Sequence, residues 1–381
     1  MLRFLTAGES HGQALVTVVE GIPAGLALDE EHIACDLARR QVGYGRGKRM
    51  QIEKDRAEIL SGVRQGMTIG SPITLLIRNK DWENWQCDMS VAATTSSVTP
   101  VTRLRPGHAD LPGVIKYGMR DVRPILERAS ARETASRVAV GAVARRFLDE
   151  LAISIRSRTV SVGGVCIEGE ENVNWDRVES SPVRCTDAKA EKLMIDDIDK
   201  AKKNGDSLGG CFEVVGSGIP IGLGSHVHWD RRLDGRISQA MMSINAAKAV
   251  EIGSGFAVTG LKGSQVHDII SCQDGVWRHA TNHAGGIEGG MSNGEDVVVR
   301  VGIKPIPTLA KPLPSLDLIT KEEVPAHVER SDVCVVPAAG VIGEAMLAVV
   351  LMDAVLEKFG GDSVQEVLCN YHNYLAQVSR S

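Results

Sequence analysis

The chain has 381 residues, of which 43% are hydrophobic and 24% are charged, so it is long enough for one large folded domain or two smaller ones. Only 14 residues are aromatic and 40 are glycine, which argues against a protein that stacks single-stranded nucleic acid and favours an enzyme with many tight turns. The net charge is −5, yet residues 1–150 carry 21 basic and 18 acidic side chains, and 17 of the basic ones are arginine. Because arginine fits carboxylates and phosphates and no long basic run is present, this bias favours a small anionic substrate over nucleic acid. Ordinary surface arginine is the alternative explanation.

The cysteine pattern and the N-terminal sequence are typical of a cytoplasmic protein. The eight cysteines are scattered, and the nearest pair lies 19 residues apart, so we predict neither disulfides nor a metal site. The N-terminal residues MLRFLTAGESHG lack the pattern of a signal peptide. The longest apolar stretch, residues 341–356, contains Glu344 and Asp353, so we expect it to be too short and too polar to cross a membrane.

The predicted elements do not alternate regularly between strand and helix. This order favours an α+β fold with antiparallel sheets over a doubly wound parallel sheet. Two capping-box sequences, Ser130 to Glu133 and Ser363 to Glu366, mark expected helix starts. Helices are predicted at residues 30–40, 131–151, 236–251, 341–358 and 363–378, and strands at 14–20, 57–63, 72–78, 153–163, 211–216, 256–261, 296–303 and 332–336. Residues 168–206 are polar and charge-rich, which indicates an insertion or a lobe boundary.

Residues 8–12, Gly-Glu-Ser-His-Gly, match the G-x-S-x-G pattern of a serine-hydrolase nucleophile elbow. The context contradicts that match, because the elbow needs a helix after the serine and residues 13–20 predict a strand. A serine and a histidine between glycines suit a loop where a ligand lies close to the backbone. An ordinary glycine turn is the alternative.

Residues 39–49 contain five basic side chains and three alternating glycines. The spacing is neither that of a Walker A loop nor that of a dinucleotide-binding fingerprint. Accessible backbone amides combined with guanidinium groups nevertheless suit the binding of an anion. A solvated basic loop is the alternative.

Two shorter motifs place polar side chains at turns. Residues 105–110, Arg-Pro-Gly-His-Ala-Asp, set a histidine between an arginine and an aspartate, where it could titrate near neutral pH or serve a purely structural role. Residues 128–130, Arg-Ala-Ser, precede a long predicted helix, whose N-terminus could bind phosphate or could simply be capped by Ser130.

Three segments in the second half of the chain have the composition of ligand-contacting loops. Residues 282–294 hold five glycines in thirteen positions, which argues against regular structure and suits a loop against a flat or phosphorylated ligand. Residues 304–308, Lys-Pro-Ile-Pro-Thr, follow a predicted strand and are stiffened by proline. Residues 329–332, Glu-Arg-Ser-Asp, suit either a ligand contact or a local ion pair.

Taken together, these segments resemble the chorismate synthase family over nearly the whole chain and in the family's order. The matching segments are GESHG (8–12), RRQVGYGRGKR (39–49), RPGHADL (105–111), RASARETASR (128–137), DRRLDGRISQAMMSINAAKAVEIGSGF (230–256), NHAGGIEGGMSNG (282–294), KPIPT (304–308) and ERSDVCVVPAAGVIGEAMLA (329–348). One such motif would be weak evidence, but eight in order are very specific. The similarity is lowest in residues 168–206.

The resemblance implies a lyase that converts 5-enolpyruvylshikimate 3-phosphate to chorismate by anti-1,4-elimination of phosphate. This is the last common step of aromatic amino acid biosynthesis by the shikimate pathway. It implies reduced FMN (FMNH2) as the cofactor, with no net redox change. The residues agree with this reaction, because a substrate with one phosphate and two carboxylates suits an arginine-rich site without metal. A histidine suits the general acid, and a flavin supplies electron chemistry that side chains lack.

The resemblance also implies roles for individual residues. His11 corresponds to the histidine that assists the departure of phosphate, His108 to the one that sets the protonation state of the flavin, and Asp332 to the aspartate that helps proton removal through the flavin. Ser10 and Ser130 correspond to serines near flavin and substrate. The residues that the resemblance implies for binding the anionic groups of the substrate are Arg40, Arg46, Arg49, Arg105, Arg132 and Arg330. Two of these, Arg40 and Arg46, are also the positions implied for binding NADP. Binding of FMN is implied for Arg128, Ala129, Ser130, Asn245, Ala246, Gly289, Lys304, Pro305, Ile306, Pro307, Thr308 and Arg330.

For the fold and assembly, the resemblance implies a β-α-β sandwich in which residues 1–381 form one domain of two similar halves, and four such chains form a homotetramer. No nucleic-acid or membrane partner is expected. NADPH remains an open second cofactor. Because no dedicated reductase domain is visible, we favour a flavin that is reduced elsewhere by an external reductase.

Two hypotheses of other classes remain at this stage. A flavoprotein oxidoreductase acting on a small phosphorylated acid would change the redox state of substrate and cofactor. A regulatory protein that binds a phosphorylated ligand would show no turnover, but two histidines and an aspartate among glycine loops argue against it. Release of phosphate with reduced FMN, without consumption of reductant, would separate the three hypotheses.

Overall fold

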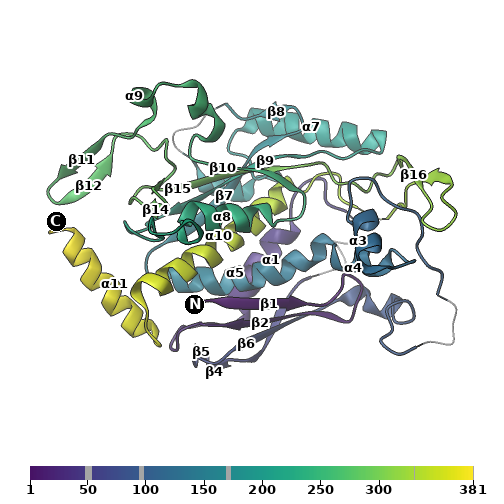
Figure 1. Cartoon of the computed structure of the whole chain (residues 1–381), viewed down its shortest axis with the longest axis horizontal. Coiled ribbons are helices and arrows are strands. Elements are labelled where there is room, and N and C mark those ends of the chain that lie inside the picture. The colour runs from purple at the N-terminus through teal and green to yellow at the C-terminus, as the bar shows by residue number, and fades with distance from the viewer. Residues whose placement is uncertain (48–53, 94–97, 169–172, 330, 381) are drawn as a thin grey trace.

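Two antiparallel sheets enclose a layer of helices in the computed structural model, which describes residues 1–47, 54–93, 98–168, 173–329 and 331–380 (Figure 1). The first sheet has the order β1-β2-β6-β3, from β1 (Arg3–Ala7), β2 (Ala14–Glu20), β6 (Ile73–Arg78) and β3 (Ala57–Ser61). The second has the order β10-β15-β9-β7-β8, from β10 (Ala247–Ile252), β15 (Val297–Ile303), β9 (Gly210–Ser217), β7 (Ser154–Val162) and β8 (Val165–Cys166). The predicted α+β sandwich is therefore confirmed.

The middle layer consists of α1 (Glu30–Gln41), α5 (Thr134–Asp149), α8 (Leu233–Met242) and α10 (Val336–Phe359). Helix α5 packs on the first sheet, α10 packs on β7 and β9 of the second, and the two helices contact each other. That contact needs Gly141, because a Cβ atom there would lie 2.3 Å from the Cβ of Ala345. The strands have the alternation that such burial requires, and in β15 the buried residues are Val297, Val299, Val301 and Ile303.

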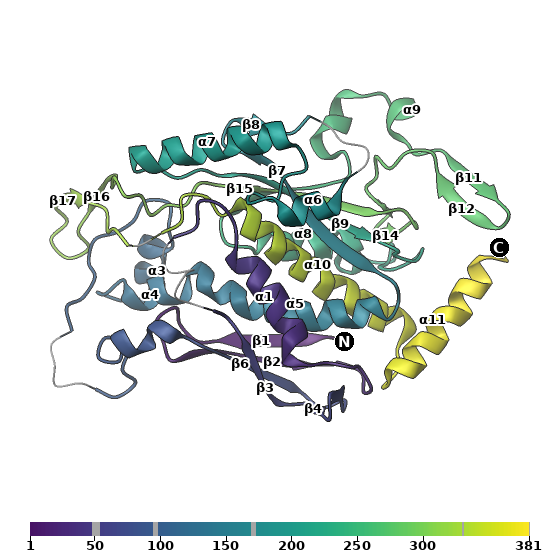
Figure 2. The same cartoon turned by 180° about the vertical axis from the view of Figure 1, so that it is seen from behind.

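The remaining elements lie around these three layers, as the view from behind also shows (Figure 2). Helix α7 (Ala188–Asn204) covers the outer face of the second sheet, and α11 (Val364–Val378) leads to the C-terminus. The other helices are α3 (Asp110–Tyr117), α4 (Arg123–Arg128), α6 (Trp175–Ser180) and α9 (Gly263–Val266), with 3-10 turns η1 (Lys80–Asn84), η2 (Ala131–Glu133), η3 (Trp229–Arg231) and η4 (Gly255–Gly260). The two-stranded pairs are β4 (Val63–Arg64) with β5 (Met67–Thr68), β11 (Ile270–Gln273) with β12 (Val276–His279), β13 (Ile287–Glu288) with β14 (Met291–Ser292), and β16 (Pro314–Leu316) with β17 (Glu323–Pro325).

Three predicted elements were wrong, and residues 282–294, expected to lack regular structure, contain the short strand pair β13–β14. The helix expected at 236–251 ends at Met242, because a turn that includes Ala246 in the left-handed region (φ +67°) leads into β10. The strand expected at 256–261 is the 3-10 turn η4, which begins and ends with glycine. The strand expected at 332–336 forms only an isolated bridge from Cys334 to Leu208, and α10 begins at Val336 with proline in its first turn.

One of the two predicted capping boxes is present. Ser363 and Glu366 each bond the backbone of the other's residue at the start of α11. Ser130 caps η2 through the backbone amide of Arg132, but the carboxylate of Glu133 binds Thr6 and Arg137 instead of returning to Ser130. The N-terminal end of this helix is therefore held by side chains from elsewhere in the fold.

Helix α10 differs from its prediction in length and hydropathy. It has 24 residues, and its best window has a mean hydropathy of 2.0, which by length and composition alone is enough to cross a membrane. In this structure 94% of that window is buried inside the protein, between α5 and the second sheet. The helix is apolar on all sides because protein surrounds it on all sides.

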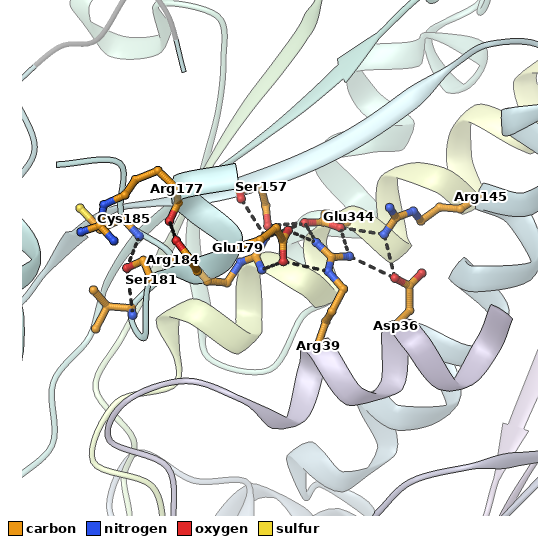
Figure 3. Close-up of polar contacts among 12 residues, drawn as sticks. Asp36, Arg39, Arg145, Ser157, Arg177, Glu179, Ser181, Arg184, Cys185 and Glu344 are labelled. Atoms are coloured by element: carbon orange, nitrogen blue, oxygen red, sulfur yellow. Dashed lines mark hydrogen bonds and ion pairs between the residues drawn. The ribbon is translucent and has the colours of Figure 1, made fainter. Parts of the chain in front are cut away.

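Glu344, on α10, is the centre of a buried polar cluster (Figure 3). Its side chain is fully buried and binds Arg39 through both oxygens, at 2.7 and 2.9 Å, with Arg145 at 2.8 Å. Burial would raise the pKa of Glu344, but the arginines outweigh burial and lower it. The cluster joins α1, α5, β7, the end of α6 and α10, and we call it the Glu344 cluster; its members are Asp36, Arg39, Arg145, Ser157, Glu179, Arg184 and Glu344.

Candidate active site

A cavity of about 710 Å³ lies where loops from both sheets meet the ends of α1, α4 and α8. Its size is typical of small-molecule sites. Most of the residues that the sequence predicts for a site line this cavity, namely Ser10, His11, Arg40, Arg46, Arg105, His108, Ala129, Ser130, Arg132, Asn245, Ala246, Lys304, Ile306, Pro307, Thr308 and Asp332. Arg128, Gly289 and Pro305 are not part of the lining, and Arg49 and Arg330 lie outside the described residues.

His11 lies in the turn between β1 and β2. Gly8 begins this turn at φ +101°, and a Cβ atom there would lie 2.3 Å from the carbonyl oxygen of Ala14, so the turn requires glycine. The Nδ1 atom of His11 lies 2.9 Å from Oε1 of Glu127, and its main-chain amide donates to Oε2 of the same carboxylate at 2.6 Å. The indole of Trp85 stacks on the imidazole with 4.1 Å between ring centroids.

His108 lies on a second loop, just before α3. Its Nδ1 atom lies 2.6 Å from Oδ1 of Asp110, and Asp110 also accepts hydrogen bonds from Nε and Nη2 of Arg105, both at 2.9 Å. Burial opposes the ionisation of Asp110, but the hydrogen bonds from His108 and Arg105 prevail and lower its pKa. A small core of Leu104, Val114, Val122 and Leu126, separate from the main core, holds this region in place.

Two buried arginines share one carboxylate at the inner wall. Asp55 binds Nη1 of Arg132 at 2.6 Å and Nη1 of Arg40 at 3.4 Å. Burial lowers the pKa of Arg40 to about 9, because Asp55 offsets only part of the desolvation and the guanidinium groups of Arg132 and Arg46 add to it. A bound anion would relieve this unfavourable charge.

Asp332 forms an ion pair with Arg46. Its Oδ2 atom lies 2.7 Å from Nη1 of Arg46, and its Oδ1 atom accepts a hydrogen bond from the amide of Gly47 at 2.5 Å. The carboxylate is therefore held by the loop that follows α1. An anion that bound Arg46 in place of Asp332 would release the Oδ2 atom of Asp332 from this ion pair.

The rest of the lining combines apolar surface with a few polar atoms. Ile306 and Pro307 supply part of the apolar surface, and the hydroxyls of Ser10 and Ser130 are 3.1 Å apart. Asn245 donates to the carbonyl of Ala129 at 3.2 Å, whereas its Oδ1 atom is buried and has no hydrogen-bond partner among the described residues. A buried acceptor without a partner is costly, so this atom suits a ligand with an N–H donor.

Positive charge dominates the lining. Among the described residues, the acidic side chains in the lining are those of Glu329 and Asp332. Burial, together with Lys248, lowers the pKa of Lys304, whose Nζ donates to the carbonyl of Gly107 at 3.0 Å. The cationic side chains in the lining are Arg40, Arg46, Arg105, Arg123, Arg132 and Lys304.

Several residues that build the site were not predicted from the sequence. Glu127 and Asp55 lie behind the lining, and Asn79 links Arg132 to the carbonyls of Glu9 and Gly12. Arg123 packs over the indole of Trp85, 5.0 Å from its centroid. No motif contains these residues, apart from the position of Glu127 immediately before residues 128–130. Asp110 was noted only as the last residue of the motif at 105–110.

Comparison with known proteins gives a single family. The family model for chorismate synthase matches residues 2–356. The chorismate synthase of Moorella thermoacetica is 56% identical over 385 residues, covering 99% of this chain and 100% of that protein. That of Geobacter sulfurreducens is 55% identical over 392 residues, covering 99% of each. A crystal structure of a chorismate synthase superposes with a TM-score of 0.81 at 46% identity, covering 100% of this chain and 99% of that one.

Proposed function

The chain belongs to the chorismate synthase family, and from that premise we propose that the cavity described above is its active site. The reaction of the chain is the lyase reaction of the family, in which 5-enolpyruvylshikimate 3-phosphate loses phosphate and a ring proton to give chorismate in aromatic amino acid biosynthesis. The observation that carries the proposal is the cavity itself. It brings six cationic side chains together with two histidines whose rings are each held by a carboxylate.

The cationic wall suits the charges of this substrate. A phosphate and two carboxylates carry about four negative charges, and arginine forks bind such groups in pairs of parallel hydrogen bonds. Arg40 and Arg132 would hold one anionic group beside their shared partner Asp55, where burial penalises the charge of Arg40 in the absence of a ligand. Arg46 and Arg105 would hold others nearer the two loops that carry the histidines.

Reduced FMN is the cofactor of the family, and the residues present fit it. The buried Oδ1 atom of Asn245 needs an N–H donor, and a flavin ring offers one. Lys304 and Ser130 would bind its polar groups, and Ile306 and Pro307 its flat face. When bound, reduced FMN supplies electron chemistry that side chains lack. Roles for Arg128, Gly289, Pro305 and Arg330 stay predictions.

The proton-transfer groups follow from the same arrangement. His11 would give a proton to the departing phosphate, and His108 would set the protonation state of the reduced flavin. Asp332 assists removal of the ring proton once an anionic substrate competes for Arg46 and releases part of the carboxylate. Ser10 and Ser130 would orient the ligands through their adjacent hydroxyls.

The decisive experiment is an anaerobic assay with FMN kept reduced by dithionite. We expect phosphate to be released from 5-enolpyruvylshikimate 3-phosphate with no consumption of reductant. Consumption of one reducing equivalent for each turnover would support the alternative, a flavoprotein oxidoreductase. Turnover with oxidised FMN in air would contradict the assignment of the cofactor state.

The source of the reduced flavin is a second part of the proposal. We propose that the chain uses flavin reduced by an external reductase, because the family model for chorismate synthase already accounts for residues 2–356. NADPH binding at Arg40 and Arg46 is the alternative. Anaerobic mixing of oxidised FMN, NADPH and the protein would separate the two, since bleaching of the flavin spectrum by the purified chain alone would favour NADPH.

We also propose a cytoplasmic homotetramer. In support, large apolar side chains are exposed at Leu5 (73%), Trp229 (76%) and Phe256 (74%), as expected of surfaces that another subunit covers. Light scattering on a size-exclusion column would measure the mass, and fractionation of cells would test the location. A mass close to the 40.8 kDa of one chain would contradict the tetramer.

A further inference from the structure

Each of the two histidines in the cavity has its Nδ1 atom against a buried carboxylate. The distance is 2.9 Å for His11 and Glu127 and 2.6 Å for His108 and Asp110. The side chains of both carboxylates are fully buried, and neither is part of the cavity lining. Glu127 and Asp110 can therefore influence a ligand only through the histidines and arginines in front of them.

Each carboxylate also faces an arginine. Glu127 lies 3.2 Å from Nη1 of Arg123, and Asp110 is bound by Arg105 through two nitrogens. An ionised carboxylate accepts hydrogen bonds and donates none. When a neutral His11 ring faces an ionised Glu127, its hydrogen is on Nδ1, and Nε2 is the nitrogen through which the ring can exchange a proton with a ligand. His108 differs, because Nη2 of Arg105, which can only donate, lies 2.9 Å from the same Nδ1 atom that faces Asp110.

The Glu127 contact is the more specific of the two. One of its oxygens accepts the main-chain amide of His11 at 2.6 Å, and both lie within 3.1 Å of the ring nitrogen. Trp85 covers one face of the ring, and Arg123 packs on that indole. The imidazole is thus fixed along one edge and on one face. Asp110, in contrast, divides its contacts between His108 and Arg105.

We propose that Glu127 is a positioning residue that holds His11 in the Nδ1–H tautomer with Nε2 directed to proton transfer. The inference rests on the proposed function for the role of His11. It extends that function to a carboxylate that does not touch the ligand. Loss of the Glu127 carboxylate alters His11 without releasing a cavity arginine from a bidentate pair.

The main variant is Glu127→Gln, which keeps the shape of the side chain. The NH2 group of the glutamine would face either the main-chain amide of His11 or Nδ1 of its ring. In the second case NH2 donates to Nδ1, so the hydrogen of the neutral imidazole has to be on Nε2. A general acid contributes about 10²–10⁴-fold to a rate, and we expect loss of its orientation to lower kcat about 10- to 100-fold while KM changes less than about threefold. Glu127→Asp retains the charge and should recover part of the rate.

A double-mutant cycle with His11→Ala separates positioning from a general structural role. In the His11→Ala background, Glu127→Gln should lower kcat no further. The matched control is Glu213→Gln, because Glu213 is also buried and bound by two arginines, Arg158 and Arg300, but lies outside the cavity. That control should leave kcat unchanged.

A spectroscopic readout tests the tautomer without any assay. Nitrogen-15 NMR of histidine-labelled protein, with the His11 signal assigned by difference from His11→Gln, should show Nδ1–H in the wild type and a changed signal in Glu127→Gln. If the wild type shows this signal but releases no phosphate from the substrate, the proposed function fails and the positioning of His11 stands. An unchanged signal in Glu127→Gln, wild-type kcat in that variant, or an equal loss of kcat in the His11→Ala background would each overturn the inference.

Discussion

Two groups of buried and half-buried arginines lie next to each other in this molecule, and they differ in how fully acidic side chains balance their charge. In the Glu344 cluster, Arg39, Arg145 and Arg184 face the carboxylates of Asp36, Glu179 and Glu344 (Figure 3). In the cavity, the six cationic side chains of the lining face two acidic ones in the lining and three more behind it, Asp55, Asp110 and Glu127, among the described residues. Balanced charge joins structural elements, whereas an excess of positive charge at the cavity surface fits a polyanionic ligand.

The contrast is clearest at two neighbouring residues of α1. Arg39 donates to both oxygens of Glu344, and these contacts raise its pKa in spite of burial. Arg40 points to the cavity wall, where burial lowers its pKa to about 9. Neighbours on a helix are turned about 100° apart, so one arginine faces each cluster. The difference between a structural arginine and a binding arginine lies in the acids that the fold brings to each.

The largest effect should come from removing a histidine of the cavity. His11→Ala or His108→Ala should lower kcat about 10²–10⁴-fold, the usual contribution of a general acid or base, with little change in thermal stability. Loss of His11 should act on elimination with FMN binding intact, and loss of His108 should alter the bound reduced-flavin spectrum. Steady-state kinetics and flavin titration under anaerobic conditions would measure both.

His32→Ala is the matched control for that experiment. His32 also has its Nδ1 atom near a carboxylate, 2.8 Å from Asp29, but this pair caps the exposed start of α1. Its loss should leave kcat unchanged. If His11→Ala and His108→Ala fold, bind FMN and turn over at the wild-type rate, then the two histidines have a structural role and no catalytic one.

The second effect concerns stability at the other cluster. Glu344→Ala would leave Arg39, Arg145 and Arg184 short of a buried partner, and breaking a buried ion pair in this way costs about 3–5 kcal/mol. We expect the free energy of unfolding to fall by that order and kcat to be nearly unchanged below the melting temperature. If the alanine variant does not fold, Glu344→Gln with chemical denaturation serves instead. Lost activity at full stability would contradict the division between the two clusters.

The sequence predicted much of the fold because burial in a layered structure leaves periodic patterns. Strand β15 alternates between buried and half-buried residues, and α11 begins with its predicted capping box. The errors occur where one hydrophobic pattern is compatible with two kinds of secondary structure. Residues 333–336, Val-Cys-Val-Val, are apolar and three of them are β-branched, which is equally compatible with a buried strand and with the entry to a buried helix.

The site was predicted in part, for a different reason. Short motifs placed Ser10, His11, Arg105 and His108 on loops that suit a ligand, and the structure brings these residues together at one cavity. The contact between Glu127 and His11 could not be predicted, because the two residues are 116 positions apart and no local sequence pattern indicates a contact at that separation. For the same reason the sequence does not distinguish Arg39 from Arg40. The partner of Arg39 comes from α10, and the partner of Arg40 comes from the segment before β3.

The third prediction compares those two arginines directly. Arg40→Met should raise KM for the substrate about 10- to 100-fold, since a hydrogen bond to a charged group is worth about 1.5–3 kcal/mol. It should cost little stability, because burial already disfavours the charge of Arg40 and Asp55 keeps Arg132 as a partner. Arg39→Met should do the reverse, lowering the melting temperature and leaving KM unchanged. Equal effects of the two substitutions on KM would show that the clusters are not separate.

The smallest effect is the dependence of stability on acid. The pKa of Glu344 is lowered in the folded protein relative to its ordinary value near 4.5, since its arginines outweigh burial, and the pKa of Glu179 is lowered to about 2 for the same reason. A carboxyl group whose folded pKa is depressed stabilises the fold above its unfolded pKa, and that contribution is lost as the pH falls below about 4.5 towards the folded value. Denaturation at a series of pH values should therefore show a free energy of unfolding that declines below about pH 4.5. Glu344→Gln cannot titrate, so its curve should be shallower over this range, whereas Arg40→Met should keep the slope of the wild type. If the slope of Glu344→Gln matched the wild type, the acid sensitivity would have to come from other carboxylates, with those of the cavity (Asp110 and Glu329, whose pKa values are also lowered) as the next to test.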